Sequence, residues 1–549
     1  MKKSLTRITA FFSLVLYCST ASFLFAQTPK KPTGGIISGK VTIKGKAAPG
    51  IVVGVRVSQP MGPFESTFKG TTDEDGKYRI ADVPSGSYTV APVAPAFVVS
   101  DSINPMGQTV VLTEGESVDG INFALIRGGV ITGKVTDADG RPVIEQHVTL
   151  LKADVQPNQR AIVNSFNGVQ TDDRGIYRMF GLPAGRYKVS AGQGEDSFYM
   201  TASGRQSYKA TFHPDVTDAS KATVIEVTEG SEAVNVDIAL GHVSQTFSAS
   251  GRVINGENGQ PVSNLNFGLQ MMIDAQRRSF VGTNAATNNK GEFKIEGLIP
   301  GKYQLFVMPQ QDSSNVRADP VAFEVIDQDV SDLVVKSAPG ISVAGTIVLE
   351  NSDDKAVLAK LFQLGVQGFV QSEMGGMMHT ASINSDGSFV IKGLDAGNAF
   401  IQLGSSFDRP MVKGFTLVRT ERDGVIQPRG LEIKNGDQVT GVRLVVNYGN
   451  ATVHGVVNVE NGTLLPDTRL FLRVNKVGDN RTILRSPPVD ARGHFVMEGI
   501  PAGTYEFSVM VLSASGSATR QPAAKQQATV QDGVVTDVVI TLDLKPPSQ

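Results

Sequence analysis

Residues 171–189 read TDDRGIYRMFGLPAGRYKV, and variants of this stretch occur five times along the chain. Each copy has a turn glycine, an aromatic residue two positions later and a second glycine ten positions after the first. The turn glycines are Gly76, Gly175, Gly291, Gly387 and Gly493, and the second glycines are Gly86, Gly185, Gly301, Gly397 and Gly503. Self-similarity at a fixed period indicates an array of similar structural units.

The residue types in the pattern predict turns and strands. Asp or Asn beside Gly favours a tight turn, because Gly accepts positive φ and the Asx side chain bonds to the turn backbone. The aromatic residue then starts an alternating strand. Residues 182–185 (LPAG) predict a second turn, in which we expect Gly185 to have positive φ. Tyr187 begins the return strand, so each repeat is expected to hold two strands joined by a five-residue connection.

An alternating segment around one glycine precedes each copy, at Gly39, Gly133, Gly251, Gly345 and Gly455. About seven short strands in each repeat of roughly 100 residues are typical of a β-sandwich. The predicted fold is all-β, with five tandem seven-stranded Ig-like or transthyretin-like sandwiches. Their predicted ranges are 34–127, 128–243 with an insertion at 192–222, 246–338, 339–447 and 448–544. The fourth is the most divergent, since Asp395 replaces the proline and Ala399 the tyrosine.

The first 26 residues resemble an export signal. Lys2, Lys3 and Arg7 precede a largely apolar run over residues 11–25, and Ala26 is a small residue before the predicted cleavage point. A retained membrane anchor and lipidation at Cys18 are the alternatives. The apolar run is short for a spanning helix, and bulky Tyr17 precedes the cysteine. We therefore predict a secreted, periplasmic or cell-surface protein, with no later transmembrane segment.

The repeats resemble a known family at several positions. In the second repeat these are Gly133 and Val135, then residues 139–143 (DGRPV), then residues 171–177 (TDDRGIY) and residues 181–187 (GLPAGRY). This combination resembles the carboxypeptidase regulatory-like domain. The resemblance covers nearly all of residues 35–544. It implies a transthyretin-like sandwich of the carbohydrate-binding-like class, and it implies no single function.

Catalytic signatures are absent from the sequence. The six histidines are His147, His213, His242, His379, His454 and His494. None has the HExxH spacing of a zinc hydrolase, and the chain has no Gly-x-Ser-x-Gly elbow. A net charge of −2 provides no basic excess for nucleic acid. We predict neither an enzyme nor a cofactor-binding protein.

Two groups of residues are candidates for ligand binding. Carboxylates gather at residues 73–75 and at Asp137 and Asp139, where they could bind calcium or serve only as turn residues. In the insertion of the second repeat, an aromatic-polar cluster could bind a glycan or pack over its own domain. Its candidate binding residues are Tyr199, Arg205, Tyr208 and Phe212.

The sequence therefore predicts an exported, non-catalytic interaction or structural protein, in the manner of a stalk or adhesion array. Its partner would be an unidentified protein or glycan at the cell surface. Extracellular carbohydrate binding and an accessory role in a secreted peptidase system are the alternatives. Short linkers and modest interdomain contacts predict an elongated particle with a radius of gyration of about 35–50 Å.

Overall fold

The computed structural model describes residues 34–544, with gaps at 58–65, 101–106, 155–167, 193–207, 244, 273–277, 282–284, 309–314, 371–377, 405–411, 465–467, 479–482 and 514–523. The predicted export signal lies outside the described residues. Among those residues, no helix has both the length and the apolar character needed to cross a membrane.

Five separate hydrophobic cores follow one another along the chain. They extend over residues 37–125, 131–240, 247–335, 341–446 and 451–542. We call the units built around them domains 1 to 5. Each core forms between two sheets whose strands turn alternate side chains inward, so each unit is a β-sandwich.

In domain 1, one sheet contains β1 (Gly35–Ile43), β2 (Lys46–Ala47), β5 (Lys77–Val83), β7 (Phe97–Val99), β9 (Ser117–Val118) and β10 (Phe123–Arg127). The facing sheet has the order β4 (Phe68–Thr71), β3 (Val52–Val57), β6 (Gly86–Val93) and β8 (Gln108–Leu112). The last strand, β10, runs parallel to the first, β1.

Domain 2 repeats this plan. One sheet contains β14 (Ile176–Leu182), β11 (Gly129–Thr136), β18 (Glu232–Ala233) and β19 (Ile238–Ala239). The other contains β13 (Val169–Gln170), β12 (His147–Lys152), β15 (Gly185–Ala191), β16 (Thr211–Phe212) and β17 (Ile225–Val227). A short 3-10 helix, η2 (Ala219–Lys221), precedes β17.

In domain 3, one sheet has the order β23 (Glu292–Leu298), β20 (Phe247–Asn255), β27 (Val330–Pro339) and β25 (Val316–Ala318). The other sheet has the order β22 (Arg278–Val281), β21 (Phe267–Met272), β24 (Gly301–Val307) and β26 (Val321–Val325). In domain 5, one sheet has the order β40 (His494–Ile500), β37 (Ala451–Glu460) and β43 (Val535–Asp543). The other sheet has the order β39 (Ile483–Arg485), β38 (Thr468–Lys476), β41 (Gly503–Ser513) and β42 (Ala524–Val530).

Domain 4 has a full sandwich despite its divergent motif. One sheet has the order β31 (Ser388–Leu394), β28 (Ile341–Leu349), β36 (Gln438–Tyr448), β33 (Phe415–Arg422) and β34 (Val425–Ile426). The other has β30 (Met378–Ser382), β29 (Gly365–Val370), β32 (Gly397–Gly404) and β35 (Leu431–Ile433). A helix, α1 (Lys355–Leu361), adds Val357 and Leu361 to its core.

The two strands of the repeated motif are present, but they do not pair with each other. β14 pairs with β11 and β15 pairs with β12, so the chain crosses from one sheet to the other between residues 182 and 185. The Tyr187 hydroxyl donates to the carbonyl of Pro183 at 2.8 Å and fixes this crossing. The same tyrosine bond occurs in domains 1, 3 and 5, at 2.7–2.9 Å.

The turn glycines behave as predicted, whereas Gly185 does not. Gly175 has φ +74°, and a Cβ there would lie 2.6 Å from the carbonyl oxygen of Val135. Gly185 is not among the residues with positive φ, so that prediction was wrong. Gly181, four residues earlier, has φ +69° instead. The glycine of the first strand also has a steric role, because a Cβ on Gly133 would lie 2.0 Å from the Val236 oxygen.

Removing one tyrosine hydroxyl tests the crossing. We expect Tyr187→Phe to destabilise domain 2 by about 1 kcal/mol, because the Pro183 carbonyl loses its donor. Hydrogen exchange over residues 128–240 of the full chain measures this effect, and domain 4, which has Ala399 at the equivalent position, serves as the internal reference. Unchanged protection in domain 2 would contradict the assigned role of the bond.

Three joints between successive domains share one construction. At the start of a domain, a glycine N–H donates to a carbonyl just before the outermost strand of the previous domain. The bonds are Gly128 to Ala96 (3.0 Å), Gly340 to Asn315 (2.8 Å) and Gly449 to Gly414 (2.8 Å). The backbone of Gly181, Gly393 or Gly499, which has positive φ in each case, packs beside these segments.

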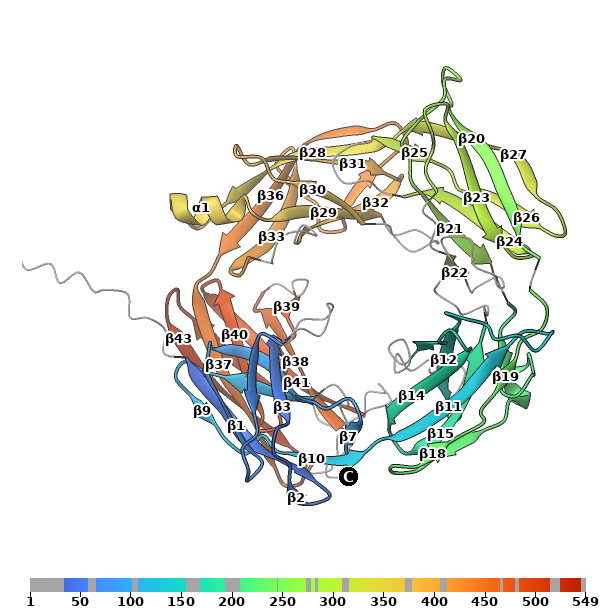
Figure 1. The fold of residues 1–549 in the computed structure, drawn as a ribbon. Helices are drawn as coiled ribbons and strands as arrows, with labels where there is room; N and C mark the ends of the chain where they lie inside the picture. Colours follow the sequence, from blue (N-terminus) through green and yellow to red (C-terminus); the bar gives the residue numbers. More distant parts are fainter. Residues whose placement is uncertain are drawn as a thin grey trace, which may run out of the picture.

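These joints do not produce a rod. Figure 1 shows the five domains following one another around a circle, with domain 5 beside domain 1. Strand β40 of domain 5 contacts β6 and β8 of domain 1. The expectation of an elongated particle is therefore wrong. Hydrogen bonds and close backbone packing fix the angle at the shared joints, and the chain closes on itself.

Candidate interaction site: the contact between domains 1 and 5

An ion-pair network joins domain 5 to domain 1 across more than 370 residues of sequence. Its centre is the turn before β40, where Asp490 Oδ1 accepts the backbone N–H groups of Arg492 and His494, both at 2.9 Å. This Asx turn is the one that the repeated motif predicts. It fixes the backbone of the turn and leaves Oδ2 of Asp490 directed toward domain 1.

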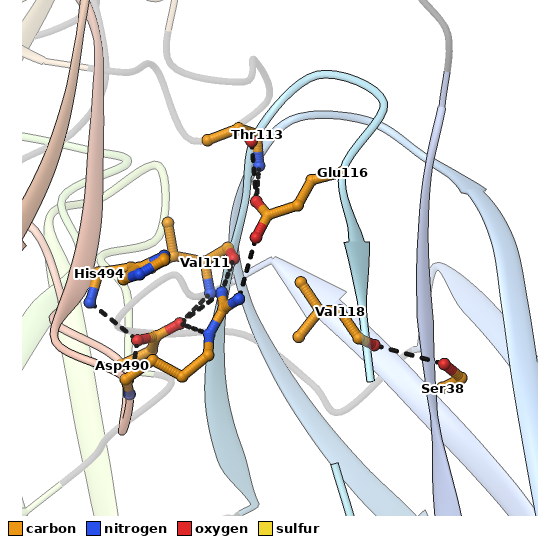
Figure 2. A network of polar contacts seen from close by, with 8 residues as sticks. Ser38, Val111, Thr113, Glu116, Val118, Asp490 and His494 are labelled. Atoms are coloured by element: carbon orange, nitrogen blue, oxygen red, sulfur yellow. Dashed lines mark hydrogen bonds and ion pairs between the residues drawn. The ribbon is translucent and has the colours of Figure 1, made fainter. Parts of the chain in front are cut away.

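Figure 2 shows Asp490 facing the end of β8, at Val111. Asp490 Oδ2 accepts the N–H of Val111 at 3.2 Å. The Arg492 guanidinium donates to the Val111 carbonyl at 2.7 Å through Nη2 and to Glu116 Oε1 at 2.9 Å through Nη1. It also donates to Asp490 Oδ2 from Nε and Nη2, at 3.0 and 2.9 Å. The backbone N–H and C=O of Val111 in domain 1 are thus bound by the Asp490 carboxylate and the Arg492 guanidinium of domain 5.

The side chains of this network are largely buried, which raises the free-energy cost of losing one of them. The Asp490 side chain is 2% exposed, and those of Glu116 and Arg492 are 22% and 33% exposed. Glu116 is further held by Thr113, whose N–H and hydroxyl both donate to Oε2 at 2.8 Å. Removing one partner of such a group leaves a buried charge without compensation, which costs more than the loss of a surface ion pair.

A second set of contacts surrounds Glu498 on β40. Its Oε1 accepts the hydroxyl of Ser85 in domain 1 at 3.0 Å, and its Oε2 accepts Lys413 Nζ of domain 4 at 2.6 Å. One side chain of domain 5 therefore bonds to both neighbouring domains.

Two valines form the apolar part of the contact. Val111 on β8 is 1% exposed and Val496 on β40 is 7% exposed, although neither belongs to the core of its own sandwich. Both point outward by strand alternation, between Val110 and Leu112 in one case and between Phe495 and Met497 in the other. Because β40 contacts β8, each valine is buried by the opposite domain.

The sequence contains a signal for this contact that our sequence analysis missed. The positions equivalent to Val111 by strand register are Glu226, Glu324, Glu432 and Thr529, all exposed. The positions equivalent to Val496, three after the turn glycine, are Arg79, Arg178, Lys294 and Val390, also exposed. Val111 and Val496 are thus apolar where most other copies carry charges, and they lie on β8 and β40, which contact each other.

The candidate residues in the insertion of domain 2 lie apart from this contact. Tyr208 is 2% exposed and belongs to the core of domain 2, so its ring is not available as a sugar platform. Phe212 is partly buried in β16, opposite Ser190 of β15. Tyr199 and Arg205 lie outside the described residues. A glycan site involving those two residues remains a prediction.

The acidic turns use their carboxylates on the backbone. Asp73 Oδ1 accepts the N–H groups of Asp75 and Lys77, and Asp137 Oδ1 accepts those of Asp139 and Arg141, all at 2.8–3.0 Å. Over the described ranges, no three His, Cys, Asp or Glu side chains gather closely enough to hold a metal ion.

Comparison with known proteins finds a family match in domain 2. Residues 130–241 match the carboxypeptidase regulatory-like domain. This match covers domain 2, whose sequence pattern the other four domains repeat. Colossin-A of Dictyostelium discoideum is 22% identical over 368 residues, which are 61% of this chain and 3% of that protein. The mouse protein BOS complex subunit NOMO1 is 23% identical over 330 residues, covering 59% of this chain and 24% of its own length. The chain therefore spans at most about a quarter of these two relatives.

Solved structures that are similar to part of this chain include pilins. A streptococcal ancillary pilin matches over 56% of this chain and 99% of its own, at 12% identity and a TM-score of 0.25. The major pilin subunit BcpA of Bacillus cereus matches over 56% and 100%, at 11% identity and a TM-score of 0.15.

Lowering the pH should weaken the contact between domains 1 and 5. Burial alone would raise the pKa of Glu116, but hydrogen bonds from Thr113 and Arg492 hold the pKa below its ordinary value of 4.5. A carboxylate with a lowered pKa stabilises the closed state above its ordinary pKa. That stability is lost as the pH falls through the lowered value. The Thr113 bonds lie within domain 1, so the part of this lowering that depends on ring closure comes from Arg492. We therefore expect a closed ring at neutral pH and opening as the pH falls below the ordinary value of 4.5.

Energy transfer between dyes on domains 1 and 5 follows this opening, with cysteines replacing the exposed Lys46 and Gln527. Glu116→Gln is the control, because it removes the titrating group and should abolish the pH dependence in this window. If the wild type and Glu116→Gln opened at the same pH, the opening would be due to other carboxylates and the role of Glu116 would be wrong.

Proposed function

We propose that the chain is an exported, non-catalytic interaction scaffold whose sandwich domains bind protein partners at the cell surface. The observation that carries this proposal is the contact between domains 1 and 5. There, Asp490 and Arg492 of one sandwich bind the strand edge of another, beside valines that replace the charged residues at most equivalent positions of the other repeats. The same type of surface can recognise sandwiches or strands of other proteins.

The perturbed titratable groups support a non-catalytic role. Such groups often mark active sites. Here, burial raises the pKa of Tyr303 and Tyr505 to about 12, and each hydroxyl donates to a backbone carbonyl within its own domain. Burial also raises the pKa of Tyr78 and Tyr177, which donate to Ile121 and Val236. These tyrosines stabilise the fold, so their raised pKa values are explained without a catalytic role.

The similarity to proteins named as subunits of a complex is a second support. Those relatives are much longer than this chain, and we carry over only the general expectation of protein–protein contact.

Cross-linking in intact cells, followed by mass spectrometry, tests the proposal. The expected result is export of the chain and a reproducible set of protein neighbours outside the cytoplasm. Retention in the cytoplasm would contradict the proposal. So would a purified chain that binds a polysaccharide array and has no protein neighbours, which would favour carbohydrate binding. Peptide hydrolysis by the purified chain would instead indicate an enzyme.

A further inference from the structure

The connection between domains 2 and 3 is longer than the other three. Only Gly128 lies between β10 and β11, and only Gly340 lies between β27 and β28. Residues 449–450 lie between β36 and β37. Between β19 and β20, by contrast, the chain passes through residues 240–246. A longer connection restricts the angle between two domains less, so motion between domains 2 and 3 is the ordinary expectation.

This connection is also exposed. Residues 241–243, 245 and 246 are all exposed, and a Cβ added to Gly241 would meet no other atom within 4 Å. The glycines that begin the other joints are buried, and these are Gly128, Gly340 and Gly449. The surroundings therefore fix the chain at those joints and leave space around it between domains 2 and 3.

Domain 3 keeps the glycine that packs at the shared joints, but nothing packs against it. Gly297 is equivalent to Gly181 and Gly499, and it also has positive φ, at +79°. A Cβ on Gly181 would lie 2.1 Å from the carbonyl oxygen of Pro95 in domain 1. A Cβ on Gly297 would meet no other atom within 4 Å. The packing that fixes the angle at the shared joints is therefore missing at this glycine.

Further contacts fix the joints on either side. Lys44 of domain 1 pairs with Glu229 of domain 2 at 3.1 Å. Asn315 Oδ1 of domain 3 accepts the N–H of Gly393 in domain 4 at 3.3 Å, and Glu498 joins domain 5 to domain 4. Domains 1 and 2 thus form one arm of the ring, and domains 3, 4 and 5 form the other. Figure 1 shows that the connection between β19 and β20 lies far around the ring from the contact between domains 1 and 5.

We propose that the ring opens by rotation about the connection between domains 2 and 3, with the two arms moving as rigid bodies. The contact between domains 1 and 5 holds the arms together in the closed ring. Opening uncovers Val111 and Val496, which are 1% and 7% exposed in the closed ring, and the backbone N–H and C=O of Val111. The closed ring is then an inhibited form whose binding surface is covered, a consequence that rests on the proposed function.

Single-molecule energy transfer locates the hinge in the chain from residue 27 onward, which has no cysteine of its own. Four pairs of dyes on cysteines that replace exposed residues report on neighbouring domains. The pairs are Lys221 with Lys290 for domains 2 and 3, Lys46 with Lys221 for domains 1 and 2, Lys290 with Lys360 for domains 3 and 4, and Lys360 with Gln527 for domains 4 and 5.

In Arg492→Glu, the pair on domains 2 and 3 should shift its mean transfer and broaden its distribution. The three pairs within the arms should keep their wild-type values. Lowering the pH below 4.5, the ordinary pKa of Glu116, opens the wild-type ring without that substitution and should give the same pattern.

Two glycine variants give a matched comparison in the closed ring. Gly241→Ala adds a methyl group in open space and should leave all four pairs unchanged. Gly340→Ala places a Cβ 2.6 Å from the Cα of Gly393 and should shift the pair on domains 3 and 4.

Three outcomes would overturn the proposal. The first is a change within an arm on opening while the pair on domains 2 and 3 keeps its value, and the second is no change in any pair with either Arg492→Glu or acid. The third is protection of the amides of residues 241–243 from hydrogen exchange equal to that of Gly128 and Gly340. None of these measurements needs a partner, so a failed search for protein neighbours would refute the proposed function without touching the hinge.

Discussion

Gly133→Val should unfold domain 2 and leave the other four sandwiches folded. A Cβ on Gly133 would lie 2.0 Å from the Val236 oxygen and 3.0 Å from the Tyr177 hydroxyl, which donates to that same oxygen at 2.5 Å. Val236 lies just before β19, which pairs in parallel with β11, so neither backbone can move without breaking the sheet. We expect destabilisation above about 4 kcal/mol, typical of severe backbone clashes in a core.

Domain-resolved hydrogen exchange on the full chain is the measurement. Gly185→Ala is the matched control, because a Cβ there would meet only the Tyr187 ring at 3.5 Å, an ordinary contact. It should cost less than about 1 kcal/mol. If the two variants lost protection equally, the distinction between the two glycines would be wrong.

Arg492→Glu should open the ring while every domain stays folded. The change places a third carboxylate beside Glu116 and Asp490 and removes the donor to the Val111 carbonyl. Breaking a partly buried, hydrogen-bonded charge pair costs about 3 kcal/mol or more, so the closed state should become more than about a hundredfold less favoured. The energy transfer between dyes on domains 1 and 5 should fall accordingly.

Domain 2 supplies a matched control. Arg174 and Asp172 form the same turn and the same ion pair at 3.1 Å, but the Arg174 side chain is 72% exposed and contacts no other domain in the structure as described. Arg174→Glu should leave the ring closed. Combining Arg492→Glu with Glu116→Arg should restore part of the energy transfer. If neither the single variant nor this pair changed the energy transfer, the network would not be what holds the ring closed.

Much of the fold could be predicted from the sequence because it depends on local chemistry. The Asx turns, the turn glycines and the alternation of strands are all short-range features, and the structure confirms the all-β tandem sandwiches. Which strands pair with each other was harder to predict from the sequence. β14 and β15 are adjacent in sequence but lie in different sheets, because the Tyr187 bond turns the chain between layers rather than back along one.

The contact between domains 1 and 5 was missed for a different reason. Val111 and Val496 each fit the alternation of an ordinary strand, and only a comparison with the charged residues at equivalent positions of the other repeats distinguishes them. That comparison requires the strand register. Tyr208 was a candidate for glycan binding, with packing over its own domain as the alternative, and the structure places it in the core of domain 2.

The central claim is that domains 1 and 5 close the chain into a ring, and small-angle scattering on the monomeric chain from residue 27 onward tests it most directly. Five spheres of roughly 34 Å diameter arranged in a ring would give a radius of gyration of about 30 Å, whereas the same spheres in line would give about 50 Å. We predict about 30 Å for the wild type, with an increase on Arg492→Glu and none on Arg174→Glu. A wild-type value of about 45 Å or more would contradict the ring.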